Sequence, residues 1–346
     1  MELTTVWFGL ITVLWIGYFC LEGFDFGVGM LLPVLAKDDT ERRVMINTIG
    51  PVWDGNEVWL LVAGGATFAA FPEWYATLFS GFYLPLLLIL VALIVRNLAF
   101  EYRGKRDDAT WRRRWDAAII GGSFLPSLLW GVAFANILRG VPIGADKEYA
   151  GGFFNLLNPY ALVGGLTTLL LFLTHGAVFL ALKTEGPIRH EARSLGARLG
   201  VPTAVVAVVF LVWTQILTGT LASAVAFALA AVLLLAGLAS LLAGREGRAF
   251  AGTFAAIAVA VAGLFLALFP DVMPTTLADG VSLTTTNAAA TAYTLKVMTI
   301  VAVIFTPVVL AYQAWTYWVF RRRIGVHHIP VAPAAVEGPA APAARG

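Results

Sequence analysis

Long apolar stretches separated by short polar connections make up nearly the whole chain. A helix that crosses the hydrocarbon core of a bilayer, ~30 Å thick, needs about 20 mostly apolar residues. Stretches close to that length occur at 6–33, 51–70, 75–100, 116–138, 159–183, 199–218, 221–244, 250–270 and 293–320. The pattern predicts an all-α integral membrane protein with about nine transmembrane helices. Two four-helix bundles plus one helix would be an ordinary way to pack them.

Basic residues fall in every second connection. The connections after the first, third, fifth and seventh stretches, and the segment after the last, contain Lys37, Arg42, Arg43, Arg103, Lys105, Arg106, Arg112, Arg113, Arg114, Lys183, Arg189, Arg193, Arg198, Arg245, Arg248, Arg321, Arg322 and Arg323. The other connections contain only Arg139 and Lys147. Because short cytoplasmic loops accumulate Lys and Arg, the alternation predicts an odd number of spans, with the N-terminus outside and the C-terminus inside the cell.

The chain divides into a polytopic membrane domain, residues 1–324, and a cytoplasmic tail, residues 325–346. The tail is rich in Pro and Ala and has no hydrophobic periodicity from Pro330 onward. Such a segment cannot bury enough apolar surface to offset the entropy of folding, so we expect it to be disordered.

Composition supports the membrane assignment and excludes other classes. Of the 346 residues, 59% are hydrophobic and 13% are charged, whereas about 25% are charged in soluble domains. The net charge of +2 and the dispersed basic residues argue against a nucleic-acid partner. The single cysteine, Cys20, excludes an internal disulfide and is expected to be a small buried apolar residue. No cluster of Cys and His has the spacing of a metal site.

Four acidic residues interrupt the first two apolar stretches: Glu22, Asp25, Asp54 and Glu57. An ionised carboxylate at the bilayer centre costs roughly 2.5–3.5 kcal/mol even on a mild scale, so such residues usually mark ion or proton pathways. Each pair is spaced i, i+3 and shares a helix face. The predicted topology places all four on the cytoplasmic side, and we expect them to handle protons. The alternative for Asp54 and Glu57 is helix capping, since carboxylates are stabilised at a helix N-terminus.

Other residues near these acids have both structural and functional interpretations. Trp53 and Trp59 flank the second acidic pair and could contact a quinone, a haem edge or another subunit, although packing is their commoner role. His175 is the one imidazole within an apolar stretch, which is too few for a chain that binds several haems. It is more often a hydrogen-bonded packing residue than a ligand. Arg96 either extends to the membrane interface or pairs with an inner carboxylate.

Several segments resemble subunit II of the cytochrome bd-type quinol oxidases, which are bacterial respiratory terminal oxidases. In order along the chain they are EGFDFGVGM (22–30), DTERRVMIN (39–47), PVWDGNEVWL (51–60), SGFY (80–83), GGSFLP (121–126), GVAFAN (131–136), GVP (140–142), NLLNP (155–159) and VMP (272–274). The resemblance covers nearly the whole membrane region, and the WDGN segment at 53–56 is specific to the family. The connection at 219–221 is shorter here than in some relatives.

The resemblance implies a heterodimer with subunit I in the bacterial plasma membrane. Subunit I would carry haem b and haem d, none of them ligated by this chain, and quinol would be the substrate whose electrons reduce oxygen to water. Subunit II would stabilise subunit I and help to build the proton motive force, with membrane lipid and a small accessory subunit as further neighbours. The family's proton uptake route from the cytoplasm implies that role for Asp54, and Glu57, Asp25 and Glu22 are candidates for a relay.

Two other functions compete with this interpretation. In a secondary transporter, the same acids would bind H⁺ or Na⁺ at the middle of the membrane between inverted repeats. The clustering of the acids on the inner side argues against it. In a purely structural scaffold, the acids would cap helices, and replacing Asp54 by Asn would leave turnover unchanged.

Overall fold

The computed structural model describes residues 2–330 and is almost entirely helical. Its α-helices are α1 (Leu3–Leu35), α2 (Asp39–Ile49), α3 (Trp53–Ala70), α4 (Pro72–Gly81), α5 (Tyr83–Tyr102), α6 (Ala109–Arg139), α7 (Pro159–Lys183), α8 (Gly186–Thr218), α9 (Leu221–Leu242), α10 (Glu246–Leu268) and α11 (Ala292–Val319). Short 3₁₀ helices occur at η1 (Arg103–Lys105), η2 (Phe153–Leu156) and η3 (Val326–His328). The strands β1 (Asp271–Met273) and β2 (Leu283–Thr284) pair antiparallel in the connection before α11.

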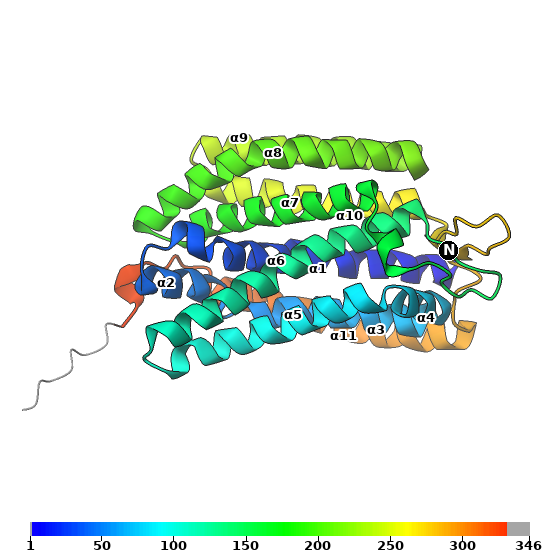
Figure 1. Ribbon diagram of the computed structural model, residues 1–346, viewed down its shortest axis with the longest axis horizontal. Coiled ribbons are helices and arrows are strands. Elements are labelled where there is room, and N and C mark those ends of the chain that lie inside the picture. Colours follow the sequence, from blue (N-terminus) through cyan, green and yellow to red (C-terminus); the bar gives the residue numbers. More distant parts are fainter. Residues whose placement is uncertain (1, 331–346) are drawn as a thin grey trace, which may run out of the picture.

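Eight helices of the described chain are long and apolar enough to cross a membrane, which confirms the predicted all-α membrane fold. They are α1, α5 with η1, and α6 to α11. The remaining predicted span, 51–70, is α3, whose 18 residues begin with an acidic turn. The long helices run side by side along the longest axis of the molecule (Figure 1).

The prediction of one helix over 75–100 is wrong, because the chain breaks at Phe82 between α4 and α5. Pro85 lies in the first turn of α5, where a backbone N–H would have no hydrogen-bond acceptor within the helix. The proline therefore removes no helical hydrogen bond at this position. Pro72 likewise begins α4 directly after α3. Two segments expected to be connections are helical instead. They are α2 and the first half of α8, which continues the span without interruption over 33 residues.

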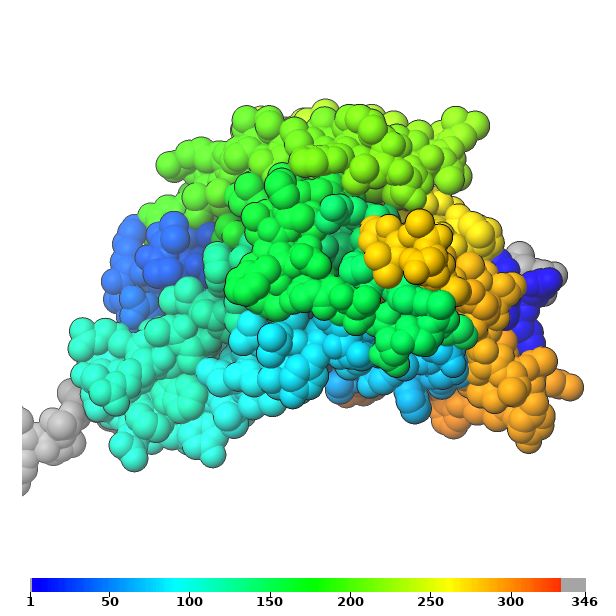
Figure 2. Space-filling view, turned by 45° about the vertical axis from the view of Figure 1, so that its right-hand side comes forward, coloured from blue at the N-terminus to red at the C-terminus, as the bar shows by residue number. Residues whose placement is uncertain are grey.

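Helix α1 occupies the centre of the molecule. Figure 1 shows α7 and α10 on one side of it, with α8 and α9 beyond them, and α3, α4, α5 and α11 on the other. In the space-filling view, α8 and α9 form an outer layer across the molecule (Figure 2). Every residue from Gly17 to Leu32 except Leu21 is buried. The side chains of α1, among them those of Glu22 and Asp25, therefore contact the helices on both sides of it.

Close contact between α1 and α7 depends on two glycines. A Cβ atom on Gly27 would lie 2.1 Å from the carbonyl oxygen of Phe172, and one on Gly176 would lie 2.5 Å from the Cα of Gly27. These are distances that real Cβ atoms do not adopt. Small residues at such positions let membrane helices approach backbone to backbone, and van der Waals contact then stabilises the pair.

The basic connections lie together at one end of the molecule, opposite the N-terminus (Figure 1). Ion pairs link them. Arg103 contacts Asp116 of α6 at 2.5 Å and Asp39 of α2 at 2.7 Å, and Arg189 of α8 contacts Glu246 of α10 at 2.8 Å. We refer to this side of the molecule as the basic end.

The chain remains packed beyond residue 324, where the sequence analysis placed the start of the tail. Ile329 is buried, and the Pro330 carbonyl accepts a hydrogen bond from Arg43 of α2. The packing of η3 against α2 accounts for this difference from the expected boundary. Residues 331–346 of the predicted tail lie outside the described residues.

We predict that Gly27→Ala lowers the thermal stability of the purified protein. The added methyl group would overpack the α1–α7 contact, at a cost of about 1–3 kcal/mol. The measurement is the unfolding temperature in detergent. Gly9→Ala on the same helix is the matched control, because nothing lies within 4 Å of its added Cβ. Equal unfolding temperatures for the two variants would show that the two backbones do not need this approach.

Candidate functional site

A fully buried arginine lies at the centre of the acidic residues. Arg96 of α5 donates from Nη1 to Glu22 of α1 at 2.5 Å and to Glu57 of α3 at 3.1 Å. Glu22 is also fully buried, whereas the Glu57 side chain is 16% exposed. The remaining Glu57 oxygen accepts a hydrogen bond from Asn97 at 2.5 Å. Of the two explanations for Arg96, pairing with inner carboxylates therefore holds.

The fourth member of the cluster is Asp25, one helical turn from Glu22 on α1. It is fully buried, and its Oδ2 accepts a hydrogen bond from Asn56 Nδ2 of α3 at 2.6 Å. The Asn56 oxygen in turn accepts from Tyr317 at 2.7 Å and from Gln313 at 3.2 Å. Helices α1, α3, α5 and α11, distant in sequence, thus meet at one site.

Asp54 does not join this cluster. It lies in the first turn of α3 and is exposed. Three residues of its helix that follow at i+4, i+7 and i+8, Val58, Leu61 and Val62, are exposed as well. The spacing of Asp54 and Glu57 places them on adjoining parts of α3, but only Glu57 turns inward to Arg96. The structure therefore brings together Glu22, Asp25 and Glu57, and leaves Asp54 on the surface beside them.

Several buried polar atoms of the cluster have no hydrogen-bond partner. They are Glu22 Oε2, Asp25 Oδ1, Arg96 Nε, Arg96 Nη2 and Asn97 Oδ1. Buried groups of this kind normally bind ordered water, which needs two to four polar partners. Donors and acceptors both occur among them, so water molecules could connect one carboxyl to the next.

Charge in the cluster is unbalanced. Three carboxyl groups face one guanidinium, so full ionisation would leave a net charge of −2 in a site shielded from water. Burying uncompensated charge costs several kcal/mol per ion. Binding protons is the simplest way to lower that charge, and a group of carboxyls that holds a variable number of protons can pass them on.

The sequence analysis assigned no individual role to Asn56, Asn97, Gln313 or Tyr317, although Asn56 belongs to the WDGN segment. Asn56 adjoins Glu57 and Asn97 adjoins Arg96, and both of these charged residues were singled out. A neutral amide next to a charged residue in sequence does not by itself indicate a role. Gln313 and Tyr317 carried a weak signal, since polar groups spaced i, i+4 on an apolar helix share one face.

The two tryptophans near the acids are packed side chains. The Trp53 ring lies 5.2 Å from that of Phe100 between centroids. Trp59 lies against Gly17, where a Cβ atom would overlap its ring, and its Nε1 donates to Gln313 at 3.2 Å. Contact of either residue with a quinone stays a prediction.

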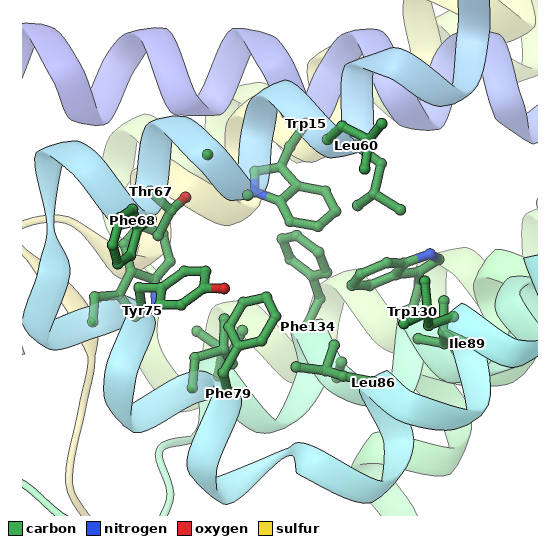
Figure 3. Close-up of a pocket in the computed structure, with 18 of the residues that line it drawn as sticks. Trp15, Leu60, Thr67, Phe68, Tyr75, Phe79, Leu86, Ile89, Trp130 and Phe134 are labelled. Atoms are coloured by element: carbon green, nitrogen blue, oxygen red, sulfur yellow. The ribbon is translucent and has the colours of Figure 1, made fainter. Parts of the chain in front are cut away.

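An apolar cavity of about 480 Å³ opens elsewhere, between α1, α3, α4, α5, α6 and α10. Its lining includes Trp15, Trp74, Tyr75, Phe79, Trp130 and Phe134, but neither Trp53 nor Trp59. Figure 3 shows the Tyr75 hydroxyl directed into this space, with the rings of Trp15, Phe134 and Trp130 around it.

His175 is not positioned as a haem ligand. Its Nε2 donates to the Cys20 carbonyl at 3.1 Å, its Nδ1 contacts the Thr253 hydroxyl at 2.8 Å, and its ring stacks on Phe250. Both ring nitrogens are thus engaged in a fully buried helix contact. Within residues 2–330, no group of three or more His, Cys, Asp or Glu side chains could hold a metal ion.

Comparison with known proteins gives concordant results. Residues 3–320 match the family described as cytochrome bd terminal oxidase subunit II. The chain is 42% identical over 329 residues to cytochrome bd ubiquinol oxidase subunit 2 of Bacillus subtilis, covering 93% of this chain and 97% of the relative. It is 37% identical over 357 residues to cytochrome bd-I ubiquinol oxidase subunit 2 of Escherichia coli K12, covering 92% and 94% respectively.

A solved structure shares the fold. A chain of the bd oxidase from Geobacillus thermodenitrificans superposes with a TM-score of 0.78, covering 92% of this chain and 99% of that one. The two sequences are 16% identical.

We predict that Arg96→Gln strongly destabilises the protein, because the variant leaves Glu22 and Glu57 buried without their counter-charge. Removing one partner of a buried ion pair costs roughly 3–5 kcal/mol. The measurement is thermal unfolding in detergent, and Arg114→Gln at the exposed basic end is the control. An unchanged unfolding temperature in Arg96→Gln would mean that the carboxyls are neutral without the arginine.

Proposed function

The chain belongs to the subunit II family of cytochrome bd terminal oxidases, and from this premise we propose that it admits cytoplasmic protons to the oxygen-reducing site of its partner subunit. Membership makes it a subunit of a respiratory quinol oxidase, a multi-pass protein of the bacterial inner membrane with a subunit I partner. Reduction of oxygen to water consumes one proton per electron, so the complex needs a route for protons as well as for electrons.

The observation that supports this role is the unbalanced buried cluster of Glu22, Asp25 and Glu57 around Arg96. Asp54 is exposed near the basic end and is suited to take up protons from water. Glu57, one helical turn along α3 and partly exposed, connects that surface to Arg96 and Glu22. Glu22 and Asp25 are both fully buried, and Asp25 bonds to Asn56. We propose that protons pass from Asp54 to Glu57 and from there to the buried pair Glu22 and Asp25.

The remaining parts of the proposal concern the partner. We infer that haem b and haem d are bound by subunit I, where they would supply electron transfer and oxygen reduction, because His175 is fully engaged in packing. This chain would stabilise subunit I through the exposed apolar faces of its helices. A small accessory subunit and lipid would cover further parts of those faces.

Proton transfer through this chain is tested by quinol-driven oxygen consumption of the co-expressed two-subunit complex. We expect Asp54→Asn and Asp25→Asn to lower turnover by about 10²-fold or more while haem content is retained, since a positioned proton-transfer group contributes roughly 10²–10⁴-fold. Asp279→Asn, in the connection between β1 and β2, is the control. Unchanged turnover in both test variants would show that these acids have only a structural role.

The direction of transfer requires that the basic end face the cytoplasm. We propose this orientation because short cytoplasmic loops accumulate Lys and Arg. Single cysteines at the exposed residues Lys105 and Ala145 would report it, and native Cys20 is buried and adds little background. A membrane-impermeant maleimide added to intact cells, with the outer membrane opened where one is present, should label Ala145→Cys and should label Lys105→Cys only after the inner membrane is opened. The reverse pattern would invert the proposed orientation.

A further inference from the structure

We propose that Trp59, Gln313 and Tyr317 are positioning residues for Asp25. Through Asn56 they form a chain of hydrogen bonds with a single possible direction, which holds an N–H group against one oxygen of the Asp25 carboxyl. This inference rests on the proposed role of Asp25 in proton transfer, and it assigns a purpose to α11, a helix that is otherwise little buried.

The direction of the chain is set at Trp59. An indole N–H can only donate a hydrogen bond. Trp59 Nε1 lies 3.2 Å from Gln313 Oε1, so the oxygen of the Gln313 amide must face the indole. The amide nitrogen of Gln313 consequently faces the other way, toward Asn56 Oδ1 at 3.2 Å.

Asn56 passes this direction on to Asp25. Its Oδ1 accepts a second hydrogen bond from the Tyr317 hydroxyl at 2.7 Å, and its Nδ2 donates to Asp25 Oδ2 at 2.6 Å. A flipped Asn56 amide would point its N–H groups at the Gln313 N–H and its oxygen at the carboxyl. The Asn56 amide is fully buried and bonded to three protein groups, so the flip would lose those hydrogen bonds. One orientation of the amide is therefore favoured strongly.

The consequence for Asp25 is a difference between its two oxygens. Oδ2 is occupied by the Asn56 donor, whereas Oδ1 is buried and has no partner. Oδ1 is thus the oxygen left to gain or release a proton. Fixing that oxygen in space matters, because proton transfer requires donor and acceptor within hydrogen-bond reach, directly or through one water.

Gln313 and Tyr317 act as a pair because they are spaced i, i+4 on one face of α11. Leu295 is the one buried residue of that helix, and Trp7 contacts the same end through Thr299. Most other residues of α11 are exposed apolar side chains. The polar pair is accordingly what this helix contributes to the buried cluster.

The test uses the intact two-subunit complex with its haem content measured. Infrared difference spectra would locate the carboxyl band of Asp25, identified by its loss in Asp25→Asn. We expect Tyr317→Phe and Gln313→Leu to shift that band and to lower turnover by about threefold to tenfold, the effect of one hydrogen bond of ordinary strength. Tyr312→Phe is the matched control, since Tyr312 lies on the same helix with its side chain exposed.

The outcomes separate this inference from the proposed function. An unshifted band in both Tyr317→Phe and Gln313→Leu overturns the positioning role, even where Asp25→Asn abolishes turnover and the proton route stands. Full turnover in both Asp25→Asn and Asp54→Asn overturns the proton route, while a shifted band in Tyr317→Phe and Gln313→Leu would still support the hydrogen-bond chain. Tyr317→Phe removes a single oxygen atom, so it reports on the bond even if Gln313→Leu disturbs folding.

Discussion

The pairing of one buried guanidinium with more than one carboxyl is the interaction on which the rest of this structure depends. Arg96 can remain in the membrane interior only while its charge is compensated, and Glu22 and Glu57 supply that compensation from two other helices. Its surroundings are shaped for it. The rings of Phe26 and Phe100 lie 4.8 Å and 5.1 Å from the guanidinium carbon, and Gly122 leaves room for its stem on the side of α6.

The cluster also divides the molecule chemically. The buried acidic side chains of α1 lie in the half of the helix that begins at Glu22, whereas the preceding half contributes Trp15 and Tyr18 to an aromatic region. The apolar cavity belongs to that aromatic half. Protons and apolar molecules would thus meet different surfaces of the same helix. This separation keeps the carboxyl groups of α1 away from a space lined mainly by rings.

Much of this arrangement could be predicted from the sequence because membrane helices obey simple physical rules. Hydrocarbon tolerates few backbone arrangements, so apolar length revealed the fold, and the alternation of basic connections revealed which loops gather at one end. Intramembrane acids are costly enough that Glu22, Asp25 and Glu57 stood out. The rotation of α3, which leaves Asp54 outside, depends on packing against α1 and α5. The break at Phe82 falls where the apolar pattern continues without interruption, so apolar length alone does not reveal it. Placing a neutral amide such as Asn56 in the membrane costs less free energy than placing a charged group there. Such a residue therefore does not by itself indicate a function.

The sequence order of the cluster has a consequence for how the protein is made. Glu22 and Arg96 are 74 residues apart, so at about 5–20 residues per second the ribosome adds the arginine roughly 4–15 s after the carboxyl. Helix α1 is thus offered to the membrane before its counter-charge exists, and Gln313 and Tyr317 arrive last of all. The nascent chain must hold those acids neutral, near water or beside the insertion machinery until α5 docks. Completion of the site is therefore a late event in biosynthesis, and a chain truncated before α11 would present an unfinished site to its quality-control machinery.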